Sequence, residues 1–208
     1  VSTWLKDESL DPRSREAIKR TEAWLSHFNE HHVHAIGFGW VFIRDIGDAP
    51  SEVTAEELRH PFSDPLGPEV EEYFLRAGWL RGRSADELLD STFVIRPGVA
   101  LEEVSLADTS AGIGFTREVT RVSRTDGPRF SHKIDAGVRA VLAGLHPQGL
   151  SLRDVVGLFA ASRSMTSENQ LQGLEATAVA AIVDLIRHGI VVPAEIAEVI
   201  SPTTQRKE

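Results

Sequence analysis

The chain has 208 residues, a formal net charge of −9 and no cysteine. The acidic balance argues against a protein whose whole surface coats nucleic acid, and the lack of cysteine excludes disulfides and thiolate metal ligands. No apolar run approaches the ~18 residues of a membrane helix and no signal peptide is recognisable, so we predict a cytoplasmic protein without membrane segments.

The first predicted element is an amphipathic helix over about residues 12–30. Asp11 followed by Pro12 is typical of a helix start, because aspartate caps free amides and proline suits the first turn. Five apolar side chains then recur at helical spacing: Ala17, Ile18, Trp24, Leu25 and Phe28.

Residues 33–43, with the sequence VHAIGFGWVFI, are predicted to form a strand. Both alternate sets of side chains are apolar beyond His34, which is typical of a strand covered on both faces. Gly37 and Gly39 remove side chains from one face, so that a helix or another backbone can approach closely.

The middle of the chain is predicted to hold a long connection, two short helices and a small sheet. Residues 44–68 are acidic and contain four prolines, which is typical of a connection. Pro68 then starts a short helix that ends near Gly78, and Ser84 with Glu87 forms a capping box for the next one. Three extended segments predict a small antiparallel sheet: 92–96, 99–108 and 113–124.

Three helices are predicted in the C-terminal part. The first covers residues 132–145, and the second opens at Ser151. The third opens with a capping box of Ser167 and Gln170 and stops at Gly189. The short extended piece GIVVP follows, so this part resembles a winged-helix arrangement.

These elements predict an α+β fold with a helix–strand start, a small antiparallel sheet and a C-terminal three-helix, winged-helix-like bundle. We therefore divide the chain into four parts. Residues 1–45 hold the first helix and strand, 46–130 the acidic connection with the short helices and small sheet, 131–200 the helical module, and 201–208 a polar tail.

The histidines do not predict a metal site. On a strand, His32 and His34 share a face beside His31, but a zinc site needs further ligands and no HExxH motif is present. The other histidines are isolated in the sequence: His27, His60, His132, His146 and His188.

No motif for catalysis or cofactor binding is recognisable. The stretches GFGWVF and GIGFTR each supply Gly-x-Gly, but they lack the third glycine of a dinucleotide fingerprint and neither opens a helix. A Walker A motif and a G-x-S-x-G elbow are also missing. We therefore predict no catalytic, cofactor-binding or metal-binding residue in this chain.

The stretch REVTRVSRTDGPRFSHK is the remaining candidate for a binding surface. Clustered arginines hold phosphates through paired hydrogen bonds, which would make this stretch face a polyanion. The alternative, which we favour, is a solvent-facing strand edge kept soluble by its charges. The candidate polyanion-facing residues are Arg117, Arg121, Arg124, Arg129 and Lys133.

Three stretches, TEAWLSHFNEHHVHAIGFGWVFIRD, HPFSDPLGPEVEEYF and LIRHGIVVP, carry a family resemblance. In this order they resemble the C-terminal part of actinobacterial-type class I methyltransferases, which use S-adenosylmethionine (SAM) and contain a small methyltransferase domain. The similarity covers the chain from about Trp4 to Pro193.

The resemblance implies that the catalytic machinery lies upstream. The family's glycine-rich cofactor loop and its Asn-Pro-Pro-Tyr-type loop do not occur here, so no catalytic or cofactor residue is carried over. The first residue is Val1 and the single methionine is Met165, so we expect a fragment of a longer protein. The helix and strand of residues 1–45 would then be the last elements of the methyltransferase sheet.

The resemblance therefore implies an accessory region that recognises substrate or acts as a lid for its own upstream methyltransferase domain. SAM is expected in the full-length protein and not in this chain. The substrate would carry amino or amide nitrogens in nucleic acid or protein. The alternative is a non-enzymatic, winged-helix-like interaction or dimerisation module; the oligomeric state is not predicted.

Overall fold

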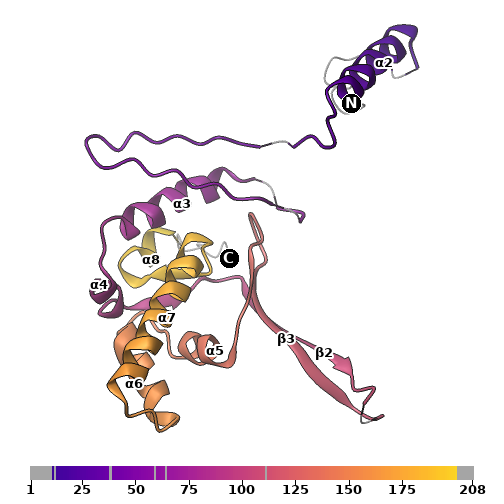
Figure 1. Ribbon diagram of the computed structural model, residues 1–208. Coiled ribbons are helices and arrows are strands. Elements are labelled where there is room, and N and C mark those ends of the chain that lie inside the picture. Colours follow the sequence, from indigo (N-terminus) through magenta and orange to yellow (C-terminus); the bar gives the residue numbers. More distant parts are fainter. Residues whose placement is uncertain are drawn as a thin grey trace, which may run out of the picture. The chain divides into compact units, whose positions relative to one another are not determined.

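The computed structural model describes residues 11, 13–37, 39–58, 60–63, 65–110 and 112–200. The predicted polar tail at 201–208 and the helix-starting Pro12 lie outside these residues. The chain divides into two compact units, Val1–Ile43 (unit 1) and Arg44–Glu208 (unit 2), and Figure 1 labels most of their elements.

Unit 1 contains the predicted amphipathic helix, α2 (Arg15–Glu30). Its N-cap is Ser14 rather than Asp11, because the Ser14 side chain accepts a hydrogen bond from the Ala17 amide at 3.1 Å. Asp11 instead accepts from the amide of Arg13 at 2.9 Å, which forms a turn before the helix. The helix is confirmed, but it starts later than the Asp11–Pro12 pair predicts.

The predicted strand at 33–43 is not formed. Its described residues, 33–37 and 39–43, are not assigned to a strand, and neither sheet of the described chain includes them. A strand exists only when a neighbouring strand takes up its amides and carbonyls, and here the described residues supply no such neighbour. The apolar side chains are therefore left exposed, Val41 to 86% and Ile43 to 88%.

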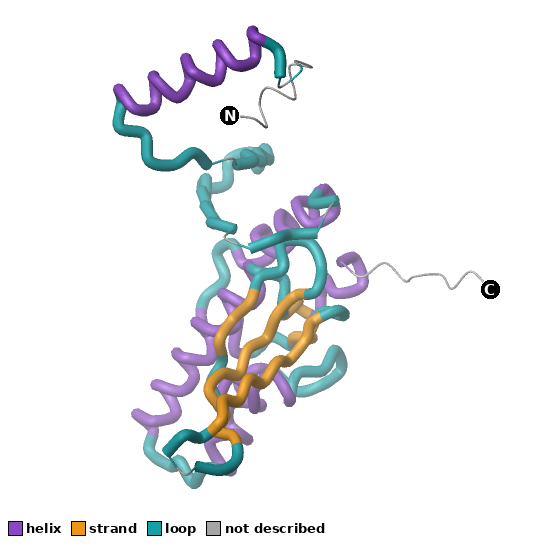
Figure 2. Tube along the Cα trace, turned by 90° about the vertical axis from the view of Figure 1, so that its right-hand side faces the viewer, coloured by secondary structure: helices purple, strands orange, loops and turns teal. Residues whose placement is uncertain are grey.

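Unit 2 confirms the α+β class. Its helices and strands follow in the order α3 (Gly67–Leu80), α4 (Ala85–Leu89), β1 (Phe93–Ile95), β2 (Val99–Ala107), β3 (Phe115–Arg124), β4 (Ser131–Lys133), α5 (Ala136–Ala143), α6 (Leu152–Ser162), α7 (Glu168–Arg187), β5 (Val191–Pro193) and α8 (Ala194–Ile200). In Figure 1 the β2–β3 ribbon extends away from the helices, and Figure 2 shows its strands side by side.

The strands form two small antiparallel sheets instead of the one that was predicted. β1 pairs with β5, placing Phe93 opposite Pro193, and the second sheet has the order β2–β3–β4. The turn at Pro97-Gly98, where Gly98 has a φ of +83°, separates β1 from β2, so the two strands join different sheets.

The strand β4 replaces the predicted start of the first C-terminal helix. Asp135 is the N-cap of α5, with extended backbone and a side chain that accepts from the Val138 amide at 2.8 Å. The residues before this cap are extended and pair with β3, His132 lying opposite Val122. The cap therefore shortens the predicted helix at its start.

The other helix ends agree with the sequence in part. The capping box of Ser84 and Glu87 is confirmed with both of its hydrogen bonds, and Ser151 caps α6. Ser167 is the N-cap of α7 but makes no side-chain cap bond, so the second predicted capping box is wrong. Gly189, with a φ of +65°, follows α7 as predicted.

One apolar core joins the elements of unit 2. The predicted bundle is present as α5, α6 and α7 followed by β5, and its core also takes side chains from α3, α4, β1 and β3. Its most deeply buried members are Phe93, Leu152, Val156, Ile182, Ile186, Ile190 and Val191. The core is thus continuous across the predicted ranges 46–130 and 131–200.

Candidate functional site

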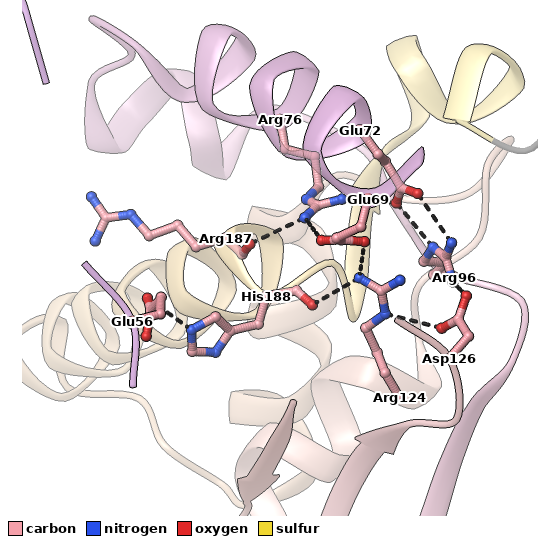
Figure 3. Close-up of polar contacts among 9 residues, drawn as sticks. All are labelled: Glu56, Glu69, Glu72, Arg76, Arg96, Arg124, Asp126, Arg187 and His188. Atoms are coloured by element: carbon pink, nitrogen blue, oxygen red, sulfur yellow. Dashed lines mark hydrogen bonds and ion pairs between the residues drawn. The ribbon is translucent and has the colours of Figure 1, made fainter. Parts of the chain in front are cut away.

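Beside this core lies a largely buried network of charged side chains, drawn in Figure 3. Three carboxylates and three guanidinium groups meet there, contributed by α3, the residue after β1, the end of β3 and the turn that follows it. The members are Glu69, Glu72, Arg76, Arg96, Arg124 and Asp126.

Arg76 is the most enclosed member, with no exposed surface. Its Nη1 donates to Glu72 at 2.8 Å and its Nη2 donates to Glu69 at 2.7 Å. Nη2 also lies 3.3 Å from the carbonyl oxygen of Arg187 at the end of α7. Side chains three, four and seven positions apart share one face of a helix, so α3 presents both carboxylates to its own arginine.

Arg124 and Arg96 extend the network from α3 to the strands. Arg124 Nη1 donates to Glu69 at 2.5 Å and its Nε donates to Asp126 at 3.1 Å. Arg96 donates two hydrogen bonds to Glu72, at 2.9 and 3.0 Å, and one to Asp126 at 2.7 Å. Paired, charge-assisted hydrogen bonds of this kind fix geometry as well as charge.

The electrostatics favour the charged forms of Asp126 and Arg96. Burial alone would raise the pKa of Asp126, but hydrogen bonds from Arg124 and Arg96 hold this pKa below its usual value. Burial likewise disfavours the charged form of Arg96, yet its hydrogen bonds to Glu72 and Asp126 raise its pKa. The network holds equal numbers of positive and negative side chains. Its hydrogen bonds connect α3 to both sheets and to the end of α7.

A pair of histidines lies next to the network. The Nε2 of His132 on β4 is 2.6 Å from the Nδ1 of His188, and the Nε2 of His188 is 3.1 Å from a carboxylate oxygen of Glu56. The ring of Phe130 stacks on His188 with centroids 4.0 Å apart. Burial, followed by the neighbouring His188, lowers the pKa of His132.

The lowered pKa of His132 predicts a loss of stability in acid. The unfolded chain takes up a proton as the pH falls through about 6.5, whereas folded His132 resists it, so acidification favours unfolding. We expect the free energy of unfolding to fall between about pH 7.5 and pH 5.5. In urea titrations, the free energy of unfolding of the His132→Gln protein should fall less steeply over this range. An equal slope in both proteins would contradict the prediction.

The structure brings the five predicted polyanion-facing residues together only in part, with Arg121 on β3 directly opposite Lys133 on β4. Arg117 pairs with Glu103 at 3.2 Å and Arg121 with Glu102 at 2.8 Å, so both are neutralised within the hairpin. Arg124 is 3% exposed, and its predicted outward position is therefore wrong, because Glu69 and Asp126 draw it inward.

Four members of the set are exposed, and within the described part of the chain two of these are unpaired. Arg129, in a turn with a φ of +56°, and Lys133 on β4 have no ion-pair partner among the described residues. Two separate cations are a weak basis for binding a polyanion, because non-specific affinity grows with the number of phosphates neutralised.

The histidines at 31, 32 and 34 are exposed, and within the described ranges no group of three or more His, Cys, Asp or Glu side chains is placed to hold a metal ion. An apolar cavity of about 50 Å³ lies between α5 and α7, lined by Val138, Val141 and Leu174 among others. Ligand pockets typically measure about 300–1,000 Å³, so this cavity does not accommodate a cofactor of the size of SAM.

Sequence reasoning missed the ion network and the histidine pair. The first left a signal in PEVEEYFLRAGW, where Glu69, Glu72 and Arg76 share a helix face. His132 and His188 are far apart in the sequence but form a hydrogen bond in the structure, and no local sequence pattern predicts that contact.

Residues 71–193, which extend from within α3 to the end of β5, match a family described as a domain of unknown function, DUF7782. Because the match covers more than half of the chain, the protein belongs to this family. No curated protein sequence matches the chain. None of the helices among the described residues has the length and apolarity needed to cross a membrane.

Proposed function

We propose that the chain is the C-terminal accessory region of a SAM-dependent methyltransferase. In this proposal unit 1 completes the sheet of an upstream catalytic domain, and unit 2 recognises substrate or acts as a lid, in the cytoplasm. The observation that carries it is the extended apolar segment 33–43, whose described residues have no strand partner within the described chain.

Among its described residues, unit 1 exposes apolar side chains on α2 and on the segment that follows it. In the segment, Trp40 is 56% and Phe42 51% exposed, and on α2 Leu25 is 55% exposed. A strand that is apolar on both faces belongs in a sheet covered by helices on both sides, which is the arrangement of α/β catalytic domains. One helix and one extended segment, the parts of unit 1 that the structure describes, are too small to bury these surfaces by themselves.

The sequence resemblance supplies the chemistry of the partner. It points to a class I methyltransferase domain, which would bind SAM and act on amino or amide nitrogens in nucleic acid or protein.

The test compares the protein translated from the complete reading frame with residues 1–208 alone. We expect the longer protein to bind SAM in calorimetry and the 208-residue chain not to bind it. In the longer protein, Val41→Lys places a charge in the proposed sheet and should reduce SAM binding by at least about tenfold, or prevent folding. Val53→Lys is the matched control, because Val53 is 94% exposed outside this segment.

Two results would count against the proposal. Micromolar SAM affinity of residues 1–208 alone would place the cofactor site in this chain. Equal SAM binding and equal thermal stability of the Val41→Lys and Val53→Lys proteins would show that the segment 33–43 is not buried in a catalytic sheet.

The alternative function, a non-enzymatic interaction or dimerisation module, is favoured by the β2–β3 hairpin. Its outer part exposes Leu106 to 57%, Ile113 to 83% and Phe115 to 77%. Such clustered apolar exposure marks protein contacts more often than chance. Light scattering of residues 1–208 and of Phe115→Ser separates the readings: a dimer that the substitution dissociates supports the alternative.

A further inference from the structure

A free strand edge runs along one side of the β2–β3 hairpin. In the sheet with the order β2–β3–β4, β2 is an outer strand, and β3 is its single neighbouring strand among the described residues. β2 has nine residues and no proline. In Figure 1 the hairpin extends away from the helices. Such an edge offers a row of backbone donors and acceptors to a strand from another chain.

The backbone groups on this edge belong to the odd-numbered residues 101–107. The carbonyl of Gly98 accepts from the amide of Thr125 at 3.1 Å. At the other end, the amide of Asp108 donates to the carbonyl of Gly114 at 3.0 Å. Hydrogen-bonding groups alternate in direction along a strand, so the even-numbered residues between these ends face β3. The bulge beside Val104 does not shift this alternation, because its extra residue lies on β3. The residues that face the free edge are Leu101, Glu103, Ser105 and Ala107.

A twofold axis limits how two copies of the chain can pair along this edge. In such a pair, residue i faces residue j of the second copy and j faces i, so each register is centred on one residue. Centres at Glu102 or Glu103 set identical carboxylates directly opposite each other, and a centre at Ser105 sets Glu102 opposite Asp108. Centres nearer either end pair fewer edge residues. A centre at Val104 avoids these like-charge pairs and pairs all four edge residues, Leu101 with Ala107 and Glu103 with Ser105.

Apolar side chains meet in rows when the register is centred on Val104. Val104 then faces Val104 of the second copy, and Val119 lies opposite Val104 within each hairpin, so valines form one row across the joined strands. Leu101 faces Ala107 of the second copy, and Phe115 lies opposite Ala107 within that hairpin. This row places two exposed apolar side chains on either side of a small one.

Opposite charges meet in a further row. Glu103 faces Ser105 of the second copy, and Arg117 lies opposite Ser105 within its own hairpin. The glutamate and the arginine are separated by a small serine, and both side chains are long enough to reach across it. Arg117 pairs with Glu103 of its own copy at 3.2 Å, so the two copies would share these charges in one network.

We propose that the chain forms a homodimer in which β2 pairs antiparallel with β2 of a second copy, centred on Val104. The two sheets then join into one continuous sheet. Interfaces of this small size give weak complexes, so we expect a Kd of roughly 0.1 mM. The inference deepens the alternative function by naming the surface and the partner. It makes no use of the methyltransferase proposal, and none of its tests reads SAM binding, so the two can fail separately.

Hydrogen exchange followed by NMR tests the pairing on the 208-residue chain. We expect the amides of the four edge residues to exchange about fourfold more slowly at about 1 mM protein than at about 20 µM. The amides of Glu102 and Val104 face β3 and should not change. A dimer whose edge amides stay unprotected forms through another surface and would overturn this proposal while leaving the alternative function standing. A monomer at both concentrations would overturn it as well.

Ser105→Pro removes one N–H from the edge, and Ser105→Ala is the matched control because it keeps this group. Proline is tolerated on an outer strand where the N–H faces away from the sheet, so the fold should remain. In sedimentation experiments, we expect Ser105→Pro to raise the Kd by at least about tenfold and Ser105→Ala by less than about twofold. Equal Kd values for the two variants would contradict pairing along this edge.

Charges at the centre test the register itself. Val104 is 37% exposed, so a long polar side chain at this position keeps its charge in water. Val104→Lys and Val104→Glu should each be monomeric, because like charges meet at the twofold axis, whereas an equimolar mixture should form the dimer again. A mixture that stays monomeric, with both variants folded by circular dichroism, would overturn the proposed pairing.

Discussion

Replacement of Arg76 by methionine is expected to lower the free energy of unfolding by about 3–5 kcal/mol, measured in urea. Methionine fills similar space, but it removes the group that neutralises Glu69 and Glu72 in a site where Arg76 has no exposed surface. Each carboxylate keeps one other arginine, so we expect the loss at the lower end of this range.

A second substitution distinguishes lost charge balance from lost packing. Arg76→Met combined with Glu69→Gln restores equal numbers of buried charges, and the new amide oxygen still accepts from Arg124. We expect the double variant to be more stable than Arg76→Met alone. A double variant that is less stable would contradict the electrostatic account.

Arg153 is the matched control for the effect of burial. It also pairs with three carboxylates, those of Asp86, Asp90 and Glu175, but its side chain is 37% exposed. Water screens such pairs, and Arg153→Met should cost much less stability than Arg76→Met. Equal losses for Arg153→Met and Arg76→Met would show that burial does not govern these networks.

Gly189→Ala is expected to cost about 3 kcal/mol, the second largest effect. The φ of +65° disfavours any side chain by about 1–2 kcal/mol, and an added Cβ would lie 2.7 Å from Arg124 Nη1 and 3.0 Å from two atoms of Arg76. Both guanidinium groups are held by carboxylates, so they cannot yield without weakening the network.

Gly82→Ala isolates the backbone part of that cost. Gly82 has a φ of +74°, but an added Cβ would meet nothing within 4 Å. We expect a loss of about 1–2 kcal/mol from conformation alone. A thermal or urea series in which both variants lose the same stability would contradict the role of Gly189 in closing the network.

Local patterns predicted most helices of this protein correctly. The apolar spacing of α2 and α7 recurs within each helix, and the capping box of Ser84 and Glu87 and the cap at Ser151 each lie within one turn. Local interactions therefore determine these features, and short stretches of sequence are enough to predict them. The start of α2 was placed too early because Asp11 and Ser14 both have capping side chains, and the sequence does not rank them.

Strand pairing was predicted less well, because it depends on residues far apart in the chain. The sequence predicts two extended pieces, residues 92–96 and the stretch GIVVP, but no local pattern indicates that they pair with each other. The segment 33–43 also shows that a strand depends on a distant partner. Its apolar sequence predicts a strand, but none forms, because no neighbouring strand is present among the described residues.

The sequence by itself determined the α+β class, the helix boundaries set by caps and glycines, and the positions of the charged residues along the chain. The tertiary structure alone decided which charges meet. Arg76 and Arg124 lie far apart in sequence, yet both bind Glu69, and His132 reaches His188 across two elements. Coulomb energy and desolvation depend on distance and burial in space, and neither quantity can be read from the linear order of residues.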